Sequence, residues 1–160
     1  MAEGKSIMMV AMDDSAHSMY ALEWTLDRFF TPFGSNHPFQ LLVVHARPLP
    51  ISVLGLAGPA SVEVIPIMEI DLKKAATRIT EKVQELCKKK SLSNVKVEVM
   101  EGDPRNVLCE AVEKHKAAIL IMGSHGYGAV KRAVLGSVSD YCAHHAHCSV
   151  MIVKKPKHRD

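Results

Sequence analysis

The sequence predicts an α/β protein, a parallel β-sheet covered by helices on both faces. Three continuous apolar runs, at 7–12, 39–46 and 117–122, are typical of strands that are buried on both sides. Segments with helical periodicity lie between the predicted strands. We expect five strands to alternate with four helices, and this alternation requires parallel strands joined by right-handed crossovers.

Size and composition indicate one soluble globular domain. A chain of 160 residues can bury one substantial core, so we expect residues 1–160 to form a single domain. Hydrophobic residues make up 48% of the chain and charged residues 23%, which is ordinary for a soluble protein. The net charge of +3 is small, and no aromatic residues are interleaved with the basic runs at 88–90 and 154–159. A nucleic-acid partner is therefore not expected.

The sequence also favours a cytoplasmic protein. Its beginning has no charged segment followed by a long apolar one, and no uncharged run approaches the roughly 20 residues of a membrane span. We therefore expect neither secretion nor a membrane partner. The four cysteines, Cys87, Cys109, Cys142 and Cys148, are then expected to be reduced thiols.

The first half of the chain contains two predicted strands, and the first of them ends in a carboxylate. Asp13 lies at the sheet edge where open α/β proteins bind ligands, so it can accept hydrogen bonds from a ribose or an adenine amine. The alternative is that Asp13 shares with Ser15 the capping of a helix over about 15–30. The strand at 39–46 is followed by a long Pro- and Gly-rich loop, 47–66, which we expect to form a mobile flap near the site.

The second half contains a long helix, an alternating strand, a capped helix and a final strand. The helix after Pro66 spans about 24 residues and keeps its apolar residues on one face. Val95–Met100 alternates apolar with charged side chains, as an edge strand does. Asp103 precedes Pro104 and is expected to cap the next helix. The last predicted strand is Ser149–Val153.

A glycine-rich turn, 123–128, follows the fourth predicted strand and is the main indication of function in the sequence. Its glycines allow a ligand to approach the backbone N–H groups closely. A helix is expected to begin at Gly136-Ser137, with Ser137 as its N-cap and Asp140 completing a capping box. Free N–H groups and the positive end of the helix dipole favour an anion, and phosphate is the expected occupant.

Two common phosphate-binding motifs are absent. A Walker loop needs Lys and then Ser or Thr after its last glycine, whereas Ala129 and Val130 follow Gly128. A dinucleotide-binding fingerprint needs glycines after the first strand, and residues 11–15 contain none. The pattern that fits is G-x-x-G, nine residues, then G-[ST], formed by Gly123, Gly126, Gly136 and Ser137.

With this pattern after the fourth strand and an Asp after the first, the chain resembles the universal stress protein family, in its nucleotide-binding branch. The residues around the motif are similar to those of plant single-domain members, and the resemblance covers nearly the whole chain. It implies a Rossmann-like open sheet of order 3-2-1-4-5 with ATP, or the related AMP or ADP, at its carboxyl edge. Mg²⁺ is expected with the nucleotide. The family order leaves Ser149–Val153 at an exposed edge, so we expect a homodimer through that strand.

The resemblance also assigns roles to particular positions. Asp13 is expected to contact the adenosine part, and the backbone at Ala46 the adenine edge. Met122 and Gly123 are expected along the ribose and the first phosphates, and the second and third glycines of the motif around the phosphate chain. The expected binding residues are Met12, Asp13, Ala46, Met122, Gly123, His125, Gly126, Gly136, Ser137, Val138 and Ser139.

Several positions leave alternatives open. His125 either donates a hydrogen bond to a phosphate or is an exposed loop residue. Lys131 and Arg132 either reach the outer phosphates or are solvated. Asp14 departs from the family pattern, because a second carboxylate weakens polyphosphate binding unless it points away or holds a cation.

No catalytic or metal site is expected. The run Cys142–Cys148 contains three histidines, but a helix there would pair only His144 with Cys148, and a closed zinc site needs four converging ligands. A buried Cys142 and partly exposed histidines are the better interpretation. We find no nucleophile, paired carboxylates or metal-ligand set beside the phosphate loop, so any ATP hydrolysis is expected to be slow.

The sequence therefore favours a cytosolic stress protein in which an adenine nucleotide acts as a signal to a downstream protein that the sequence does not name. One rival is a chaperone-like interaction module with a vestigial nucleotide site. Redox or heat would then drive its assembly through Cys87, Cys109 or Cys148. The other rival is a slow ATPase.

Overall fold

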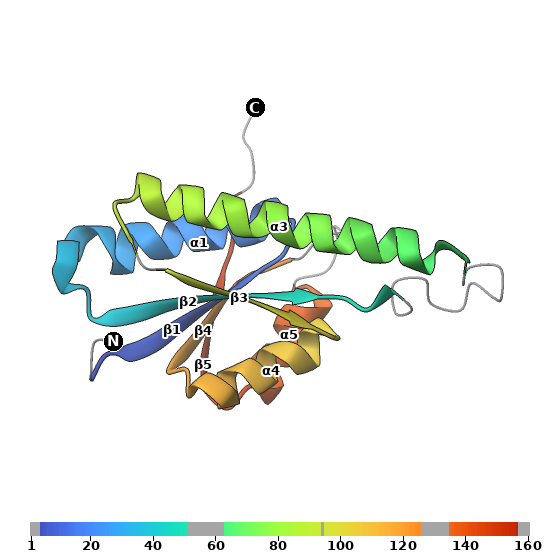
Figure 1. Cartoon of the computed structure of the whole chain (residues 1–160). Coiled ribbons are helices and arrows are strands. Elements are labelled where there is room, and N and C mark those ends of the chain that lie inside the picture. Colours follow the sequence, from blue (N-terminus) through green and yellow to red (C-terminus); the bar gives the residue numbers. More distant parts are fainter. Residues whose placement is uncertain (1–3, 51–62, 94, 126–134, 157–160) are drawn as a thin grey trace.

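The computed structural model describes residues 4–50, 63–93, 95–125 and 135–156. Its centre is a five-stranded sheet of order β3-β2-β1-β4-β5, in which each neighbouring pair of strands is parallel (Figure 1). This confirms the expected fold class and strand order, with β3 and β5 as the edge strands. The strands are β1 (Ser6–Met12), β2 (Phe39–Arg47), β3 (Lys96–Glu101), β4 (Ile119–Gly123) and β5 (Ser149–Val153).

Helices cover both faces of the sheet. α1 (Ala16–Phe29) and α3 (Ile65–Lys89) lie on one face, and α4 (Pro104–His115) and α5 (Ser137–His145) lie on the other (Figure 1). A short 3₁₀-helix, η1 (Thr31–Asn36), follows α1. In the part of the chain that the structure describes, no helix is long and apolar enough to cross a membrane.

β1 lies between two hydrophobic cores. Met8 and Val10 pack with Leu22 in the core beneath α1 and α3. Met9, which faces the other way, packs with Leu108 in the core beneath α4 and α5. Successive side chains of a strand point to opposite faces, so a strand covered on both sides is apolar at every position. This explains the continuous apolar run at the start of the sequence.

Side-chain caps begin α1 and α4. Ser15 is the N-cap of α1, and its Oγ accepts a hydrogen bond from the Ser18 backbone N–H at 3.1 Å. Asp103 is the N-cap of α4, and its Oδ1 accepts one from the Arg105 N–H at 2.9 Å. The predicted cap at Asp103 is confirmed.

The predicted cap of α5 is wrong by one residue. Gly136 is the N-cap, in an extended conformation (φ −66°, ψ 157°), and Ser137 is the first helical residue. The Gly136 carbonyl accepts the first helical hydrogen bond, from the Asp140 N–H at 2.9 Å. Asp140 therefore lies one position beyond the place that a capping box requires.

β2 is one residue longer than predicted because it stays paired with β3. Arg47 lies opposite Glu101 in the register, and Arg47 Nη2 lies 2.8 Å from Glu101 Oε2. The predicted loop at 47–66 is shorter at its other end too, since Pro66 already lies in the first turn of α3. The expected flap falls mainly on 51–62, outside the described residues.

Candidate functional site

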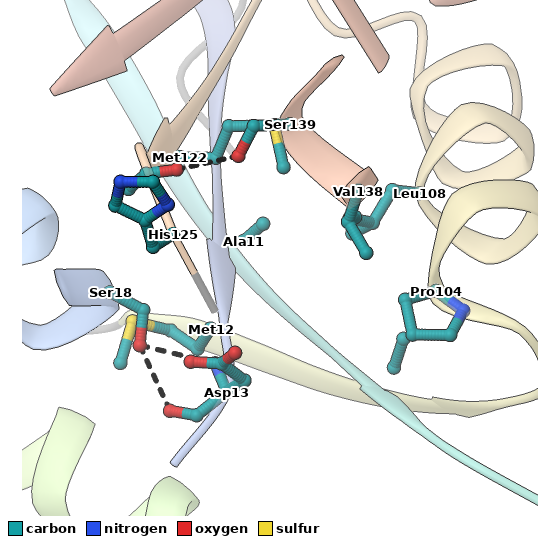
Figure 2. Close-up of a pocket in the computed structure, with 12 residues that line it drawn as sticks. Ala11, Met12, Asp13, Ser18, Pro104, Leu108, Met122, His125, Val138 and Ser139 are labelled. Carbon is teal, nitrogen blue, oxygen red and sulfur yellow. Dashed lines mark hydrogen bonds between the residues drawn. The ribbon is translucent and has the colours of Figure 1, made fainter. Parts of the chain in front are cut away.

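A hollow of about 100 Å³ opens at the carboxyl ends of the central strands. It lies between β1, β2 and β4, and the first turns of three helices complete its wall (Figure 2). In this view His125 and Ser18 lie on one side and Val138 and Leu108 on the other. The lining residues are Ala11, Met12, Asp13, Ser18, Ala46, Pro104, Leu108, Met122, Gly123, His125, Val138 and Ser139.

The fold brings most of the predicted binding positions together here. Gly136 and Ser137 directly precede the lining residue Val138 but are not among the lining residues described. Gly126, and the connecting residues Lys131 and Arg132, lie outside the described residues. The predicted positions that line the hollow are Met12, Asp13, Ala46, Met122, Gly123, His125, Val138 and Ser139.

The strand order explains why these positions meet. β1 lies between β2 and β4, and the chain leaves β1 toward α1 on one face and leaves β4 toward α5 on the other. The helices that follow β1 and β4 therefore lie on opposite faces of the sheet, and the hollow opens at the ends of these strands. Open α/β sheets bind ligands at this topological switch point.

Asp13 supports the start of α1 and also lines the hollow. Its Oδ1 accepts hydrogen bonds from the Ser15 N–H at 3.0 Å and from the Ser15 hydroxyl. Ser18 Oγ lies 2.9 Å from the Asp13 carbonyl oxygen and donates to it. The N-cap itself is Ser15, and the hydrogen bonds from Ser15 to Asp13 fix the orientation of the cap. Asp13 can therefore support the start of α1 and also contact a ligand in the hollow.

Asp14 points away from the hollow toward α3. Its carboxylate lies 3.7 Å from Arg78 Nη2 and 3.6 Å from Lys82 Nζ. These two cations offset its charge, so Asp14 meets the condition under which a second carboxylate is compatible with a bound anion.

Two hydrogen bonds tie the start of α5 to the end of β4. Ser139 Oγ donates to the buried Gly123 carbonyl oxygen at 2.7 Å, and the Gly136 N–H donates to the Ser124 carbonyl oxygen at 2.7 Å. The Ser139 hydroxyl and the Gly136 N–H thus position the helix. Helix geometry leaves the N–H groups of Ser137, Val138 and Ser139 without an intrahelical acceptor, and these groups can bind an anion.

Comparison with models of known protein families shows the family of this chain. The model of the universal stress protein family matches residues 6–154. The chain belongs to the universal stress protein family.

Curated members of this family are similar over most of the chain. Universal stress protein PHOS34 from Arabidopsis thaliana is 30% identical over 167 residues, which cover 94% of this chain and 62% of PHOS34. Universal stress protein MJ0531 from Methanocaldococcus jannaschii is 33% identical over 119 residues, which cover 74% of this chain and 65% of MJ0531. The chain thus spans slightly less than two thirds of the length of these relatives.

Solved structures share the fold. The hypothetical protein MJ0577 matches with a TM-score of 0.76 at 21% identity, over 96% of this chain and 98% of that one. A universal stress protein family protein from Arabidopsis thaliana with AMP bound matches with a TM-score of 0.67 at 24% identity, over 94% of this chain and 92% of that one. At these identities the likeness shows the fold alone.

In this universal stress protein, the first turn of α1 packs closely on Gly123, the last residue of β4. A Cβ added at Gly123 would lie 2.8 Å from both the backbone carbon and the carbonyl oxygen of His17. The first glycine of the motif therefore makes room for the first turn of α1. The sequence pattern had suggested only that it makes room for a ligand.

The close approach of α1 also produces a histidine pair that sequence reasoning missed. The rings of His17, in the first turn of α1, and His125, two residues after β4, have centroids 5.2 Å apart in an edge-to-face arrangement. No described residue forms a hydrogen bond with the buried Nδ1 of either ring. Burial lowers the pKa of His17 below its ordinary value of 6.5, and the positive charges of His125 and Lys155 lower it further.

This pKa shift predicts a pH-dependent stability. The folded-state pKa of His17 lies below 6.5, so the fold favours the neutral imidazole. The protein therefore has its full stability above about pH 6.5 and loses part of it as the pH falls through the folded-state pKa. Between pH 7.5 and 5.5 we expect the urea midpoint of the wild type to fall further than that of His17→Gln. The control is His144→Gln, at an exposed position of α5 that should behave like the wild type. An equal fall in wild type and His17→Gln would contradict the prediction.

The cysteine and histidine run after Cys142 does not form a metal site among the described residues. α5 ends at His145, so His144 and Cys148 do not share a helix face. Cys142 is buried, as predicted, and burial raises the pKa of its thiol to about 12. Cys87 is also buried, and burial raises its pKa to about 11. Buried, protonated thiols react slowly, which weighs against Cys87 in the redox-driven rival.

Proposed function

We propose that this protein binds an adenine nucleotide, ATP, ADP or AMP, in the hollow and acts as a nucleotide-dependent regulatory dimer in the stress response. One observation carries the proposal. The ends of β1, β2 and β4 and the first turn of α5 converge on one hollow and supply different chemistry from each side.

Each part of an adenine nucleotide has a suitable surface. Ala46, Leu108 and Met122 offer apolar contact for the base. Asp13 offers a carboxylate for ribose hydroxyls. The free N–H groups at the start of α5 suit a phosphate. A hollow of about 100 Å³ encloses only part of such a ligand, since pockets for small molecules are typically about 300–1,000 Å³. The remainder would extend beyond the described lining.

The ligands of related structures support the adenine class. One Arabidopsis thaliana family member was solved with AMP bound, another universal stress protein in complex with cAMP, and one from Archaeoglobus fulgidus in complex with dAMP. These ligands share an adenine base and a phosphate. Mg²⁺, if it takes part here, is expected to arrive with a polyphosphate, because the described residues do not gather three or more metal-ligating side chains.

Titration calorimetry of the purified protein with ATP, ADP, AMP and GTP tests the proposal. We expect the adenine nucleotides to bind and GTP to bind at least about tenfold more weakly, a difference of about 1.4 kcal/mol. Equal affinity for GTP and ATP would overturn the adenine selectivity. If no nucleotide binds, the interaction-module hypothesis becomes the better one.

The dimer is expected to form through β5. This edge strand pairs with β4 on one side, and Val150 and Ile152 in its middle are uncharged and half-buried. An unprotected edge strand favours pairing with a second chain, and an added lysine discourages it. Light scattering should give a dimer for the wild type and a monomer for Val150→Lys. The same substitution on the other edge, Val99→Lys, should leave the dimer intact. A monodisperse wild-type monomer would contradict this prediction.

A further inference from the structure

We propose that His17 and His125 form a proton-coupled contact with a phosphate group of the bound nucleotide. This inference rests on the proposed function, since it names residues that would recognise the phosphate of that ligand. It adds His17, which lies outside the glycine motif and outside every binding position expected from the sequence.

His125 lines the hollow, and the ring of His17 lies against it, with the ring centroids 5.2 Å apart. The His17 backbone packs directly on Gly123, the last residue of β4, and His125 follows two residues later and lines the hollow. The neighbouring residue Ser18 lines it as well. This close packing sets the distance between the first turn of α1 and the end of β4, the two segments that carry the imidazoles.

Both imidazoles have an unused polar atom. The Nδ1 atoms of His17 and His125 are buried, and no described residue forms a hydrogen bond with them. A buried polar atom without a partner is costly, and in folded proteins such atoms usually face an ordered water or an ion. A protonated imidazole donates from both ring nitrogens, so protonation would give this pair donors for an anion.

The charges around the pair favour an anion over a metal cation. The charges of His125 and of Lys155, which follows β5, both lower the pKa of His17. The opposing charge is that of Asp13, whose Oδ1 accepts two hydrogen bonds from Ser15. When the imidazoles are protonated, their charges and that of Lys155 exceed the charge of this one carboxylate. A phosphate group would offset that excess, whereas the described residues do not gather the three or more ligating side chains of a metal site around the pair.

Anion binding and protonation are therefore linked. The positive charges of His125 and Lys155 contribute to the low pKa of His17, after burial. A phosphate bound beside the rings would reverse that electrostatic contribution and favour the imidazolium form. Binding then takes up a proton near neutral pH, and the affinity increases as the pH falls. One fully linked proton gives at most about a tenfold change in affinity per pH unit.

Calorimetry measures this proton directly. AMP and adenosine are titrated into the wild type, His17→Gln and His125→Gln at pH 7.0, each in PIPES and in Tris, whose ionisation enthalpies differ. The apparent enthalpy difference between the buffers gives the number of protons taken up. The second pKa of the AMP phosphate, about 6, contributes to every protein alike, so the quantity compared is the difference between proteins. His144→Gln serves as the matched histidine control at an exposed site.

We expect the wild type and His144→Gln to take up a larger fraction of a proton with AMP than either His17→Gln or His125→Gln. Adenosine, which has no phosphate, should give no such difference. From pH 7.5 to 6.5 the wild-type affinity for AMP should rise about threefold or more relative to His17→Gln. Histidine NMR titrations of the wild type should show the pKa of His17 higher with AMP than without it, a readout that needs no variant.

Several results would overturn the inference. AMP binding with the same proton uptake in all four proteins, or an unchanged His17 pKa on AMP binding, would exclude a phosphate contact while leaving the proposed function standing. Tighter binding of Zn²⁺ alone by the wild type than by His17→Gln, without proton uptake on AMP binding, would assign the pair to a metal instead. Failure of the wild type to bind any adenine nucleotide would overturn the proposed function and this inference together.

Discussion

Ala46→Leu is expected to lower the affinity for AMP by at least about 100-fold, which corresponds to about 2.7 kcal/mol. Ala46 lies at the carboxyl end of β2 and lines a hollow of only about 100 Å³. A leucine adds an isopropyl group to this space and would occupy the volume proposed for the base. Since the added group enters an existing hollow, the packed cores beneath the helices need not change.

The matched control is Ala143→Leu, the same substitution at an exposed position on α5. It should bind AMP like the wild type. Calorimetry measures the affinities, and circular dichroism with thermal melting checks that both variants are folded. A folded Ala46→Leu with wild-type affinity would show that the nucleotide, if it binds, does not use this hollow.

Gly123→Ala is expected to be the most destabilising single methyl addition at the site. The new Cβ would lie 2.8 Å from two backbone atoms of His17 and 3.0 Å from the His17 Cβ. Backbone cannot rotate away as a flexible side chain can, so α1 must move off β4. Overpacking of this kind typically costs about 1–3 kcal/mol and sometimes more. For a chain of this size, each kcal/mol lowers Tm by about 2–4 °C, so we expect a fall of roughly 5–10 °C.

Gly34→Ala provides the comparison. Gly34 has φ 56° and ψ −126°, a conformation that residues with a side chain rarely adopt, but a Cβ there meets no atom within 4 Å. Its cost is therefore backbone strain alone, about 1–3 kcal/mol. Hydrogen exchange should separate the two causes: Gly123→Ala should increase exchange in the first turn of α1, and Gly34→Ala should not. Unchanged exchange in α1 of Gly123→Ala would mean that α1 and β4 are not packed as tightly as the structure indicates.

The fold was predictable because its signals are local. The apolar run that became β1, the alternating residues of β3 and the Asp103-Pro104 helix start each act over a few residues. The differences come from contacts between distant segments. β2 extends to Arg47 because Glu101 on β3 pairs with it.

The candidate site was predictable to a lesser degree. The positions after β1 and β4 could be expected to meet because parallel strands end at the same edge. The sequence pattern could not show that the Ser139 hydroxyl donates to the Gly123 carbonyl, or that His17 lies against Gly123, because both depend on how helices pack on β4. Nucleotide binding itself remains a prediction.

The contact between α1 and Gly123 has a mechanical consequence. It leaves α1 no room to move closer to the end of β4, since the backbones of His17 and Gly123 are in close contact there. The opposite wall, α5, is held to β4 through the hydrogen bonds of Ser139 and Gly136. Hydrogen bonds can lengthen or exchange partners, whereas backbone segments in close contact have little room to move. A ligand that needs more room would therefore displace α5, and α5 leads directly into the edge strand β5.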